Sequence, residues 1–352
     1  MRKNGVSVLK IAAAYIGTVV GAGFATGQEI LQFFAGFGLS GLWGIILTTL
    51  LFIVFGFIIM ELGFKLSARS HLEIIRQSGG NILGFVIDLI ITFFLFGALT
   101  AMIAGTGALF HQQFGLPAIA GNLLMAALTA LTVLSGINGV INSISAVVPF
   151  LLASVVGISV FSIINTPPDL APVAQAGYGL ADNWLIAGVV YVSYNIILSI
   201  AVLGPLGARA KDKKTVLKGA VLGGLGLGLG VVMIYLAILG NMAAIKDLEI
   251  PMSHIAGNIS RNTQIIYAVI LIAEVYTTAV ASLYGFSARL SNAEKSPRAS
   301  RALVTGTAAA AFFASLAGFS NLIKYLYPIV GYAGLLLLGC LLYSKLKSRR
   351  SA

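Results

Sequence analysis

The chain has 352 residues, of which 58% are hydrophobic and only 9% are charged, and its formal net charge is +11. A soluble domain carries roughly 25% charged residues, so this composition excludes a water-soluble globular protein. The apolar stretches reach the length of a membrane helix, about 20 residues, and the alternating segments of about ten residues that form a β-barrel are absent. Cys340 is the only cysteine, which excludes an intrachain disulfide. We therefore expect an all-α integral membrane protein.

Ten membrane spans are predicted along the chain. With the N-terminus inside, the inner segments hold all but three of the 22 basic residues, as the positive-inside rule requires. The exceptions are Lys246, Arg261 and Lys324. The positive charge is thus explained by basic loops on one side of a lipid bilayer, not by nucleic acid, and both termini are expected to be cytoplasmic in the plasma membrane. The spans cover residues 8–35, 39–64, 82–110, 117–136, 140–164, 184–207, 215–240, 263–287, 300–319 and 323–344.

The ten spans divide into two groups of five. Because five is odd, two related groups must lie in opposite orientations, which is the inverted repeat found in many secondary transporters. We expect one repeat in residues 1–164 and the second in 184–346. An extracellular loop at 165–183 would join them, and 347–352 would form a basic cytoplasmic tail.

The first span contains four glycines within Gly17–Glu29. Glycine costs about 1 kcal/mol relative to alanine inside a helix. A carboxylate inside a membrane span, here Glu29, indicates a functional site. We therefore expect the first helix to be interrupted around Gly21, Ala22 and Gly23. The sixth span, its partner in the second repeat, is expected to be interrupted at Ser193, Tyr194 and Asn195.

The eighth span carries Glu274, Thr277 and Thr278 at the depth of the bilayer midplane. Hard monovalent cations prefer oxygen ligands, and an unwound helix offers free backbone carbonyls. A sodium site between the first and eighth spans is the resulting hypothesis. Alternatively, the two threonine hydroxyls hydrogen-bond back to their own helix.

The pattern Gly17-x-x-Val20-Gly21-x-Gly23 resembles the first-span signature of LeuT-fold transporters, which include the neurotransmitter:sodium symporters and the amino acid–polyamine–organocation group. Thr277-Thr278 is similar to the region that completes their sodium site. The whole chain resembles the YkvI-like amino acid permeases. This resemblance implies ten helices arranged as 5+5 inverted repeats, with helices 1 and 6 discontinuous, that work by alternating access.

The resemblance also implies roles for individual residues. Sodium would bind the backbone carbonyls of Gly17, Val20 and Glu274 and the hydroxyls of Thr277 and Thr278, and no cofactor is implied beyond this coupling ion. The amides around Gly21 to Gly23 would bind the carboxylate of a substrate. The expected substrate contacts are Gly21, Ala22, Gly23, Thr26, Glu29, Ser193, Tyr194, Asn195 and Tyr276.

Three roles stay open for Glu29: it binds a substrate amine, pairs with Arg261 or Lys324 at an outer gate, or satisfies amides freed by the break. Asp88 is expected to pair with Lys10 or with an arginine of a neighbouring loop. Glu61 and Lys65 are expected to form an i,i+4 pair.

The sequence thus predicts a secondary active transporter, and not an enzyme, since no histidine lies within a predicted span. Sodium-coupled symport of an amino acid or similar small zwitterion is the leading hypothesis. One alternative is proton-coupled transport of amino acids or other small organic solutes through Glu29 or Glu274. The other is a permease-like receptor that binds a small molecule without net transport.

Overall fold

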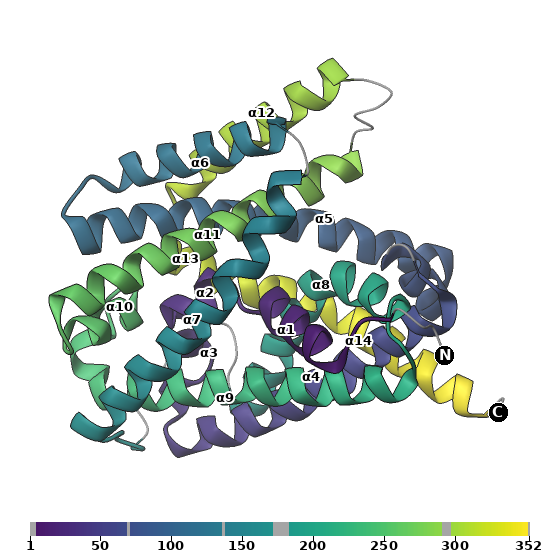
Figure 1. The fold of residues 1–352 in the computed structure, drawn as a ribbon, viewed down its shortest axis with the longest axis horizontal. Coiled ribbons are helices and arrows are strands. Elements are labelled where there is room, and N and C mark those ends of the chain that lie inside the picture. Colours follow the sequence, from purple (N-terminus) through teal and green to yellow (C-terminus); the bar gives the residue numbers. More distant parts are fainter. Residues whose placement is uncertain (1–4, 69–70, 136–137, 172–182, 291–296, 351–352) are drawn as a thin grey trace.

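The computed structural model is described for residues 5–68, 71–135, 138–171, 183–290 and 297–350, and helices make up nearly all of these ranges (Figure 1). Within the long α5, Gly80 has a positive φ of 73° and separates a short first part from the main helix. The elements are α1 (Val8–Val19), α2 (Ala22–Thr26), α3 (Gln28–Phe33), the 3-10 turn η1 (Ala35–Phe37), α4 (Leu39–Leu66), α5 (His71–Phe114), α6 (Ala118–Ser135), α7 (Asn138–Asn165), α8 (Trp184–Ala208), α9 (Lys213–Ile245), α10 (Pro251–Gly257), α11 (Arg261–Leu290), α12 (Pro297–Ser315), α13 (Phe319–Asn321), the π-helical η2 (Leu322–Leu326) and α14 (Tyr327–Arg350).

Seven helical segments among the described residues are long and apolar enough to cross a membrane, which confirms a multi-pass membrane protein. They comprise α4, α5, α6, α8, α9, α11 and the segment Phe319–Lys347. Two shorter apolar helices, Val8–Val19 and Phe150–Asn165, coincide with the first and fifth predicted spans, and α12 lies where the ninth was expected. The count of ten spans, the orientation of the termini and the division into two repeats stay predictions. Residues 172–182 of the expected loop and 351–352 of the tail lie outside the described residues.

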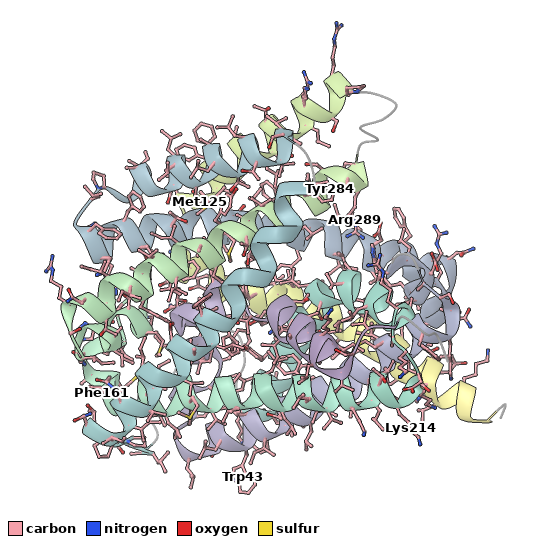
Figure 2. The ribbon with its side chains drawn as sticks, in the orientation of Figure 1. Trp43, Met125, Phe161, Lys214, Tyr284 and Arg289 are labelled. Atoms are coloured by element: carbon pink, nitrogen blue, oxygen red, sulfur yellow. The ribbon has the colours of Figure 1, made fainter. Side chains whose placement is uncertain are left out.

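The surface of α4 shows how the protein faces lipid. Leu39, Trp43, Ile46, Leu50 and Val54 are all exposed and recur every three or four residues, so they form one stripe along the helix. Figure 2 shows Trp43 projecting outward from this helix. An exposed apolar stripe is costly in water but is what the hydrocarbon core of a bilayer requires.

The first helix is interrupted, as the glycine pattern predicts. Helix α1 ends at Val19, and Val20 and Gly21 are extended, with ψ angles of 112° and −173°. Helix α2 then runs for five residues and ends at Gly27, whose φ of 81° is in the left-handed region that favours glycine.

The predicted interruption of the sixth span is wrong, because α8 is one continuous helix from Trp184 to Ala208. Unlike Gly21 and its neighbours, Ser193, Tyr194 and Asn195 carry no strong helix-breaking tendency. The Asn195 side chain also bonds within the helix, donating to the carbonyl of Tyr191 at 2.9 Å. The residues at this position are thus compatible with a regular helix, and α8 stays continuous.

Glycines allow the helices around the break to approach closely. A Cβ placed on Gly63 of α4 would lie 2.1 Å from the carbonyl oxygen of Gly204 on α8. On α9, Gly223 lies against Tyr15 of α1, and Gly228 against Thr49 of α4. The glycines of α9 thus allow close helix packing, as small residues on membrane helices commonly do.

Candidate functional site

The break between α1 and α2 exposes backbone groups at the centre of the helix bundle. The Val20 amide still donates to Ile16, but no backbone amide of the described residues bonds to the carbonyl of Gly17 or Val20. The first amides of α2 likewise lack helical partners. A Cβ built on Gly21 would meet no atom within 4 Å, so open space adjoins the break. Free acceptors and free donors therefore lie beside this space.

The carboxylate of Glu29 folds back onto α2. A Cβ built on Gly23 would lie only 2.2 Å from Oε1 of Glu29, and the Tyr194 hydroxyl of α8 donates to Oε2 at 2.5 Å. Glu29 is 4% exposed and forms no ion pair with a described Lys, Arg or His. The outer-gate pair with Arg261 or Lys324 is therefore not found. Glu29 instead joins the broken helix to α8.

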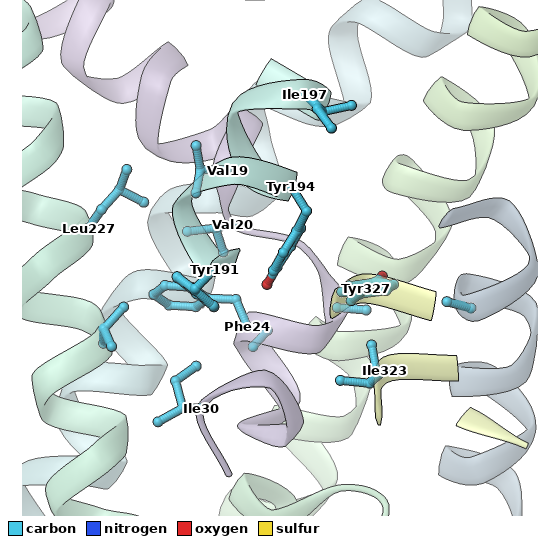
Figure 3. Packing of buried hydrophobic residues seen from close by; sticks show 14 of the residues in the cluster. Val19, Val20, Phe24, Ile30, Tyr191, Tyr194, Ile197, Leu227, Ile323 and Tyr327 are labelled. Atoms are coloured by element: carbon cyan, nitrogen blue, oxygen red, sulfur yellow. The ribbon is translucent and has the colours of Figure 1, made fainter. Parts of the chain in front are cut away.

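Tyr194 belongs to a group of five buried aromatic residues, which we call the aromatic cluster. They come from α3, α5, α8 and the start of α14. Measured from the Tyr194 ring, the other four ring centroids lie at 5.0 to 5.9 Å. Figure 3 shows the Tyr194 hydroxyl directed into the space between Tyr191, Tyr327 and the Phe24 side chain of α2. The cluster consists of Phe33, Phe94, Tyr191, Tyr194 and Tyr327.

Of these five residues, the sequence predicted only Tyr194 as part of the site; it missed Phe33, Phe94, Tyr191 and Tyr327. Tyr327 directly follows the π-helical segment Leu322–Leu326, a rare geometry that often occurs at functional sites. This segment changes which face of the helix Tyr327 lies on, and no residue pattern signals it. The pair Tyr191 and Tyr194 does carry a signal, since residues three apart share a helix face.

Helix α11 presents a second buried carboxylate toward the break. Tyr267 donates to the carbonyl of Ala25 in α2 at 2.5 Å. Glu274 follows seven residues later, which is about two turns, and thus lies on the same face. It is 2% exposed, and its Oε2 has no hydrogen-bond partner among the described residues.

The expected sodium ligands on α11 are held by their own helix. The Thr277 hydroxyl donates to the Glu274 carbonyl at 2.9 Å, and Thr278 is half-buried. Helix α11 packs against α2, whereas α1 packs mainly against α9 and α8. The sodium site made of Gly17, Val20, Glu274, Thr277 and Thr278 stays a prediction.

Several expected substrate contacts point elsewhere. Ser193 Oγ would lie 2.6 Å from a Cβ on Gly334 of α14, and the Tyr276 hydroxyl is 2.7 Å from the Thr132 hydroxyl of α6. Asn195 bonds to its own helix, and Thr26 donates to the Gly23 carbonyl at 3.2 Å. Of the expected set, the structure brings Gly23, Glu29 and Tyr194 into contact.

The site is closed in this conformation. Tyr194 is fully buried, and Glu29 nearly so. A pocket of about 240 Å³ lies elsewhere, between the ends of α7 and α10. A solute can therefore reach Glu29 only if helices move. The pocket is lined by Phe161, Ser162, Asn165, Thr166, Ile255 and Asn258.

Two charged clusters connect helices away from the break. Asp88 pairs with Arg289 of α11, which confirms the expected pair with a neighbouring arginine, and it also lies 3.2 Å from His71. Glu61 of α4 contacts three lysines, of which the sequence predicted only the one on its own helix. These are Lys65, Lys213 and Lys345, so Glu61 also connects α4 to α9 and α14.

No protein-family model matches the chain. Two proteins of Bacillus subtilis (strain 168) are similar over nearly their whole lengths. "Uncharacterized membrane protein YkvI" is 32% identical over 351 residues, which is 100% of both chains. The chain belongs to the family of YkvI. "Uncharacterized protein YyaD" is 30% identical over 335 residues, 95% of this chain and 96% of that one. The resemblance to YkvI-like proteins is thus confirmed, and their description as amino acid permeases stays a prediction.

Solved structures of LeuT-fold transporters share the architecture. MhsT in complex with L-phenylalanine has a TM-score of 0.66 and 14% identity, covering 90% of this chain and 80% of its own. Inward-facing Mhp1 gives 0.60 and 14%, covering 89% and 72%. Mhp1 closed with bromovinylhydantoin bound, described as a nucleobase-cation-symport-1 family transporter, gives 0.57 and 14%, covering 89% and 74%. At this identity the likeness shows the fold alone.

Proposed function

We propose that this protein is a secondary active transporter that carries an amino acid or similar small zwitterion by alternating access, coupled to sodium. The observation that carries the proposal is the break in the first helix at Val20 and Gly21. Non-helical backbone at membrane depth is tolerated only where it is buried in protein or lines a cavity. Transporters place their substrate and ion sites at such breaks.

The comparisons support transport as the class of function. Mhp1, a nucleobase-cation-symport-1 family transporter, and MhsT, whose structure contains L-phenylalanine, both have this fold. The closed site supports alternating access, because Glu29 and Tyr194 are buried and a solute can reach them only after helices move.

Sodium is favoured by the oxygen atoms around the break. The carbonyls of Gly17 and Val20 are free of helical hydrogen bonds, and α11 offers two hydroxyls and the Glu274 carbonyl. Rotation of the Thr277 side chain would release its hydroxyl from that carbonyl and make both available to an ion.

A proton is the second candidate coupling ion, and a specific observation favours it. Glu29 and Glu274 are both buried without an ion pair to described residues. A carboxylate in such surroundings either takes up a proton or binds a cation.

Uptake of radiolabelled amino acids into proteoliposomes tests these alternatives. An inward sodium gradient should drive uptake, and Thr277→Ala with Thr278→Ala should abolish the sodium dependence. Thr305→Ala is a matched control, because Thr305 also bonds back to its own helix but is exposed on α12. Uptake that follows a pH gradient without sodium would support proton coupling. Loss of this uptake in Glu29→Gln or in Glu274→Gln would then identify the carboxyl group that carries the proton. Saturable binding without uptake or exchange would identify a receptor.

A further inference from the structure

The position of Glu29 conflicts with recognition of a substrate carboxylate at Gly23. The Glu29 carboxylate already lies against Gly23, where the amides of α2 were expected to bind an anion. Two like charges about 4 Å apart repel by about 4 kcal/mol at an effective dielectric constant of 20. Helix α2 has only five residues, so it adds little dipole to offset this repulsion. A carboxylate of the solute is therefore strongly disfavoured at Gly23 while an ionised Glu29 occupies this place.

The same carboxylate lacks a positive partner. The Tyr194 hydroxyl donates a hydrogen bond to this carboxylate at 2.5 Å. No Lys, Arg or His of the described residues forms an ion pair with it. A hydrogen bond from the neutral Tyr194 hydroxyl, with the Tyr191 phenol close by, does not repay the removal of a carboxylate from water, which costs several kcal/mol in practice. A bound cation would supply the missing charge.

The aromatic cluster adds a second feature suited to a cation. The negative faces of aromatic rings attract ammonium groups, by about 0.5–2 kcal/mol for each well-placed ring. Within the described residues, the lysines that lie over aromatic rings do so at Tyr325 and Phe57, not at the cluster. No lysine of the described residues therefore lies over a ring of the cluster, and a ligand would reach these rings only after the helices move.

We propose that Glu29 and the aromatic cluster recognise the ammonium group of the solute, and that a carboxylate on the solute is dispensable. The substrate class is then the organic amines, including amino acids by virtue of their amine. This inference rests on the proposed function in taking the break as the solute site. The ammonium would pair with Glu29 beside Tyr194, among the rings of Tyr191 and Tyr327.

Matched sets of probes test which end of the solute is recognised. One set is leucine, 3-methylbutylamine and 4-methylpentanoate; the other is phenylalanine, 2-phenylethylamine and 3-phenylpropanoate. In each, the second probe lacks the carboxylate and the third lacks the amine. Thermal unfolding of the purified protein is titrated with each probe at constant pH and ionic strength. Both amines should raise the melting temperature of the protein. The concentration of each amine at half-maximal effect, its midpoint, should lie within about tenfold of that of its amino acid, a difference of at most about 1.4 kcal/mol. Neither acid should raise the melting temperature.

Glu29→Gln should raise the amine concentration needed for half-maximal stabilisation by at least about tenfold. The substitution removes the negative charge but keeps an acceptor for the Tyr194 hydroxyl. Glu249→Gln is the matched control, since that side chain contacts the backbone of Ser320 and not the cluster; its midpoints should equal those of the wild type. Protection by the acids, no protection by any amine, or unchanged midpoints in Glu29→Gln would each overturn the inference.

The outcomes also separate this inference from the proposed function. Sodium-driven uptake of the acids would retain transport and overturn amine recognition. Saturable amine binding that Glu29→Gln weakens, without uptake or exchange in proteoliposomes, would retain amine recognition and overturn transport.

Discussion

Replacing Gly23 by alanine tests the contact between the broken helix and Glu29. The new Cβ would lie 2.2 Å from Oε1, 2.6 Å from Cγ and 2.7 Å from Cδ of Glu29. Since real Cβ atoms essentially never approach closer than 3.0 Å, Oε1 must retreat by at least 0.8 Å. The Glu29 side chain is nearly fully buried, so this movement should break its hydrogen bond with Tyr194.

The magnitude follows from two opposing effects. Hydrogen bonds to charged groups contribute about 1.5–3 kcal/mol. Alanine in place of glycine within α2 returns up to about 1 kcal/mol of helix propensity. The expected net loss is therefore about 0.5–2 kcal/mol, or up to a few degrees in melting temperature for a chain of this size.

Thermal unfolding in detergent, followed by intrinsic fluorescence, measures the loss. Gly21→Ala is the matched control: it lies in the same break, and its Cβ would meet no atom within 4 Å. A double-mutant cycle with Tyr194→Phe makes the test specific, since both changes act on one hydrogen bond and their effects should not add. Full additivity, or a Gly23→Ala protein as stable as the wild type, would refute the reasoning.

Two further predictions concern other helices. Gly63→Ala would place a Cβ 2.1 Å from the Gly204 carbonyl oxygen and force α4 from α8, so we expect a loss of about 1–3 kcal/mol in thermal unfolding. Gly339→Ala, with open space around it, should instead stabilise α14 by up to about 1 kcal/mol, and equal effects would contradict the packing argument. Asp212 accepts a hydrogen bond from the Thr215 amide at 2.7 Å, and its bonds with Thr215 hold the pKa of the Asp212 carboxyl below its usual value. Its stabilisation is thus present above the usual carboxyl pKa and lost as the pH falls through the lowered one, so the melting-temperature gap to Asp212→Asn should close with acidification.

The position of Glu29 bears on how transport would proceed. Glu29 lies on α3; its carboxylate accepts the hydrogen bond from Tyr194 of α8 and lies against Gly23 of α2. Tyr267 of α11 donates to the Ala25 carbonyl of α2. Helix α1, by contrast, packs on α8 and α9. A solute that takes over the Glu29 contact would weaken one of these connections, and this couples binding to helix movement.

The sequence by itself determined the properties that depend on local chemistry. Composition and span length predicted a helical membrane protein, because lipid requires apolar surfaces and internally satisfied backbone. Glycine density predicted the break at Gly21, because helix propensity is a property of the residues themselves. The glycines of α9 act locally in the same way, since a missing Cβ allows helices to approach whatever their partner is.

Only the tertiary structure decided how the site is assembled. Glu29 and Tyr194 are 165 residues apart, and their hydrogen bond depends on the relative register of two helices. The continuity of α8 at Ser193 to Asn195, where the inverted-repeat argument and the resemblance predicted a break, was likewise seen only in the structure. Tyr327 joins the cluster because a π-helical segment precedes it. Such contacts arise from the rotation and spacing of packed helices, which no local pattern of residues encodes.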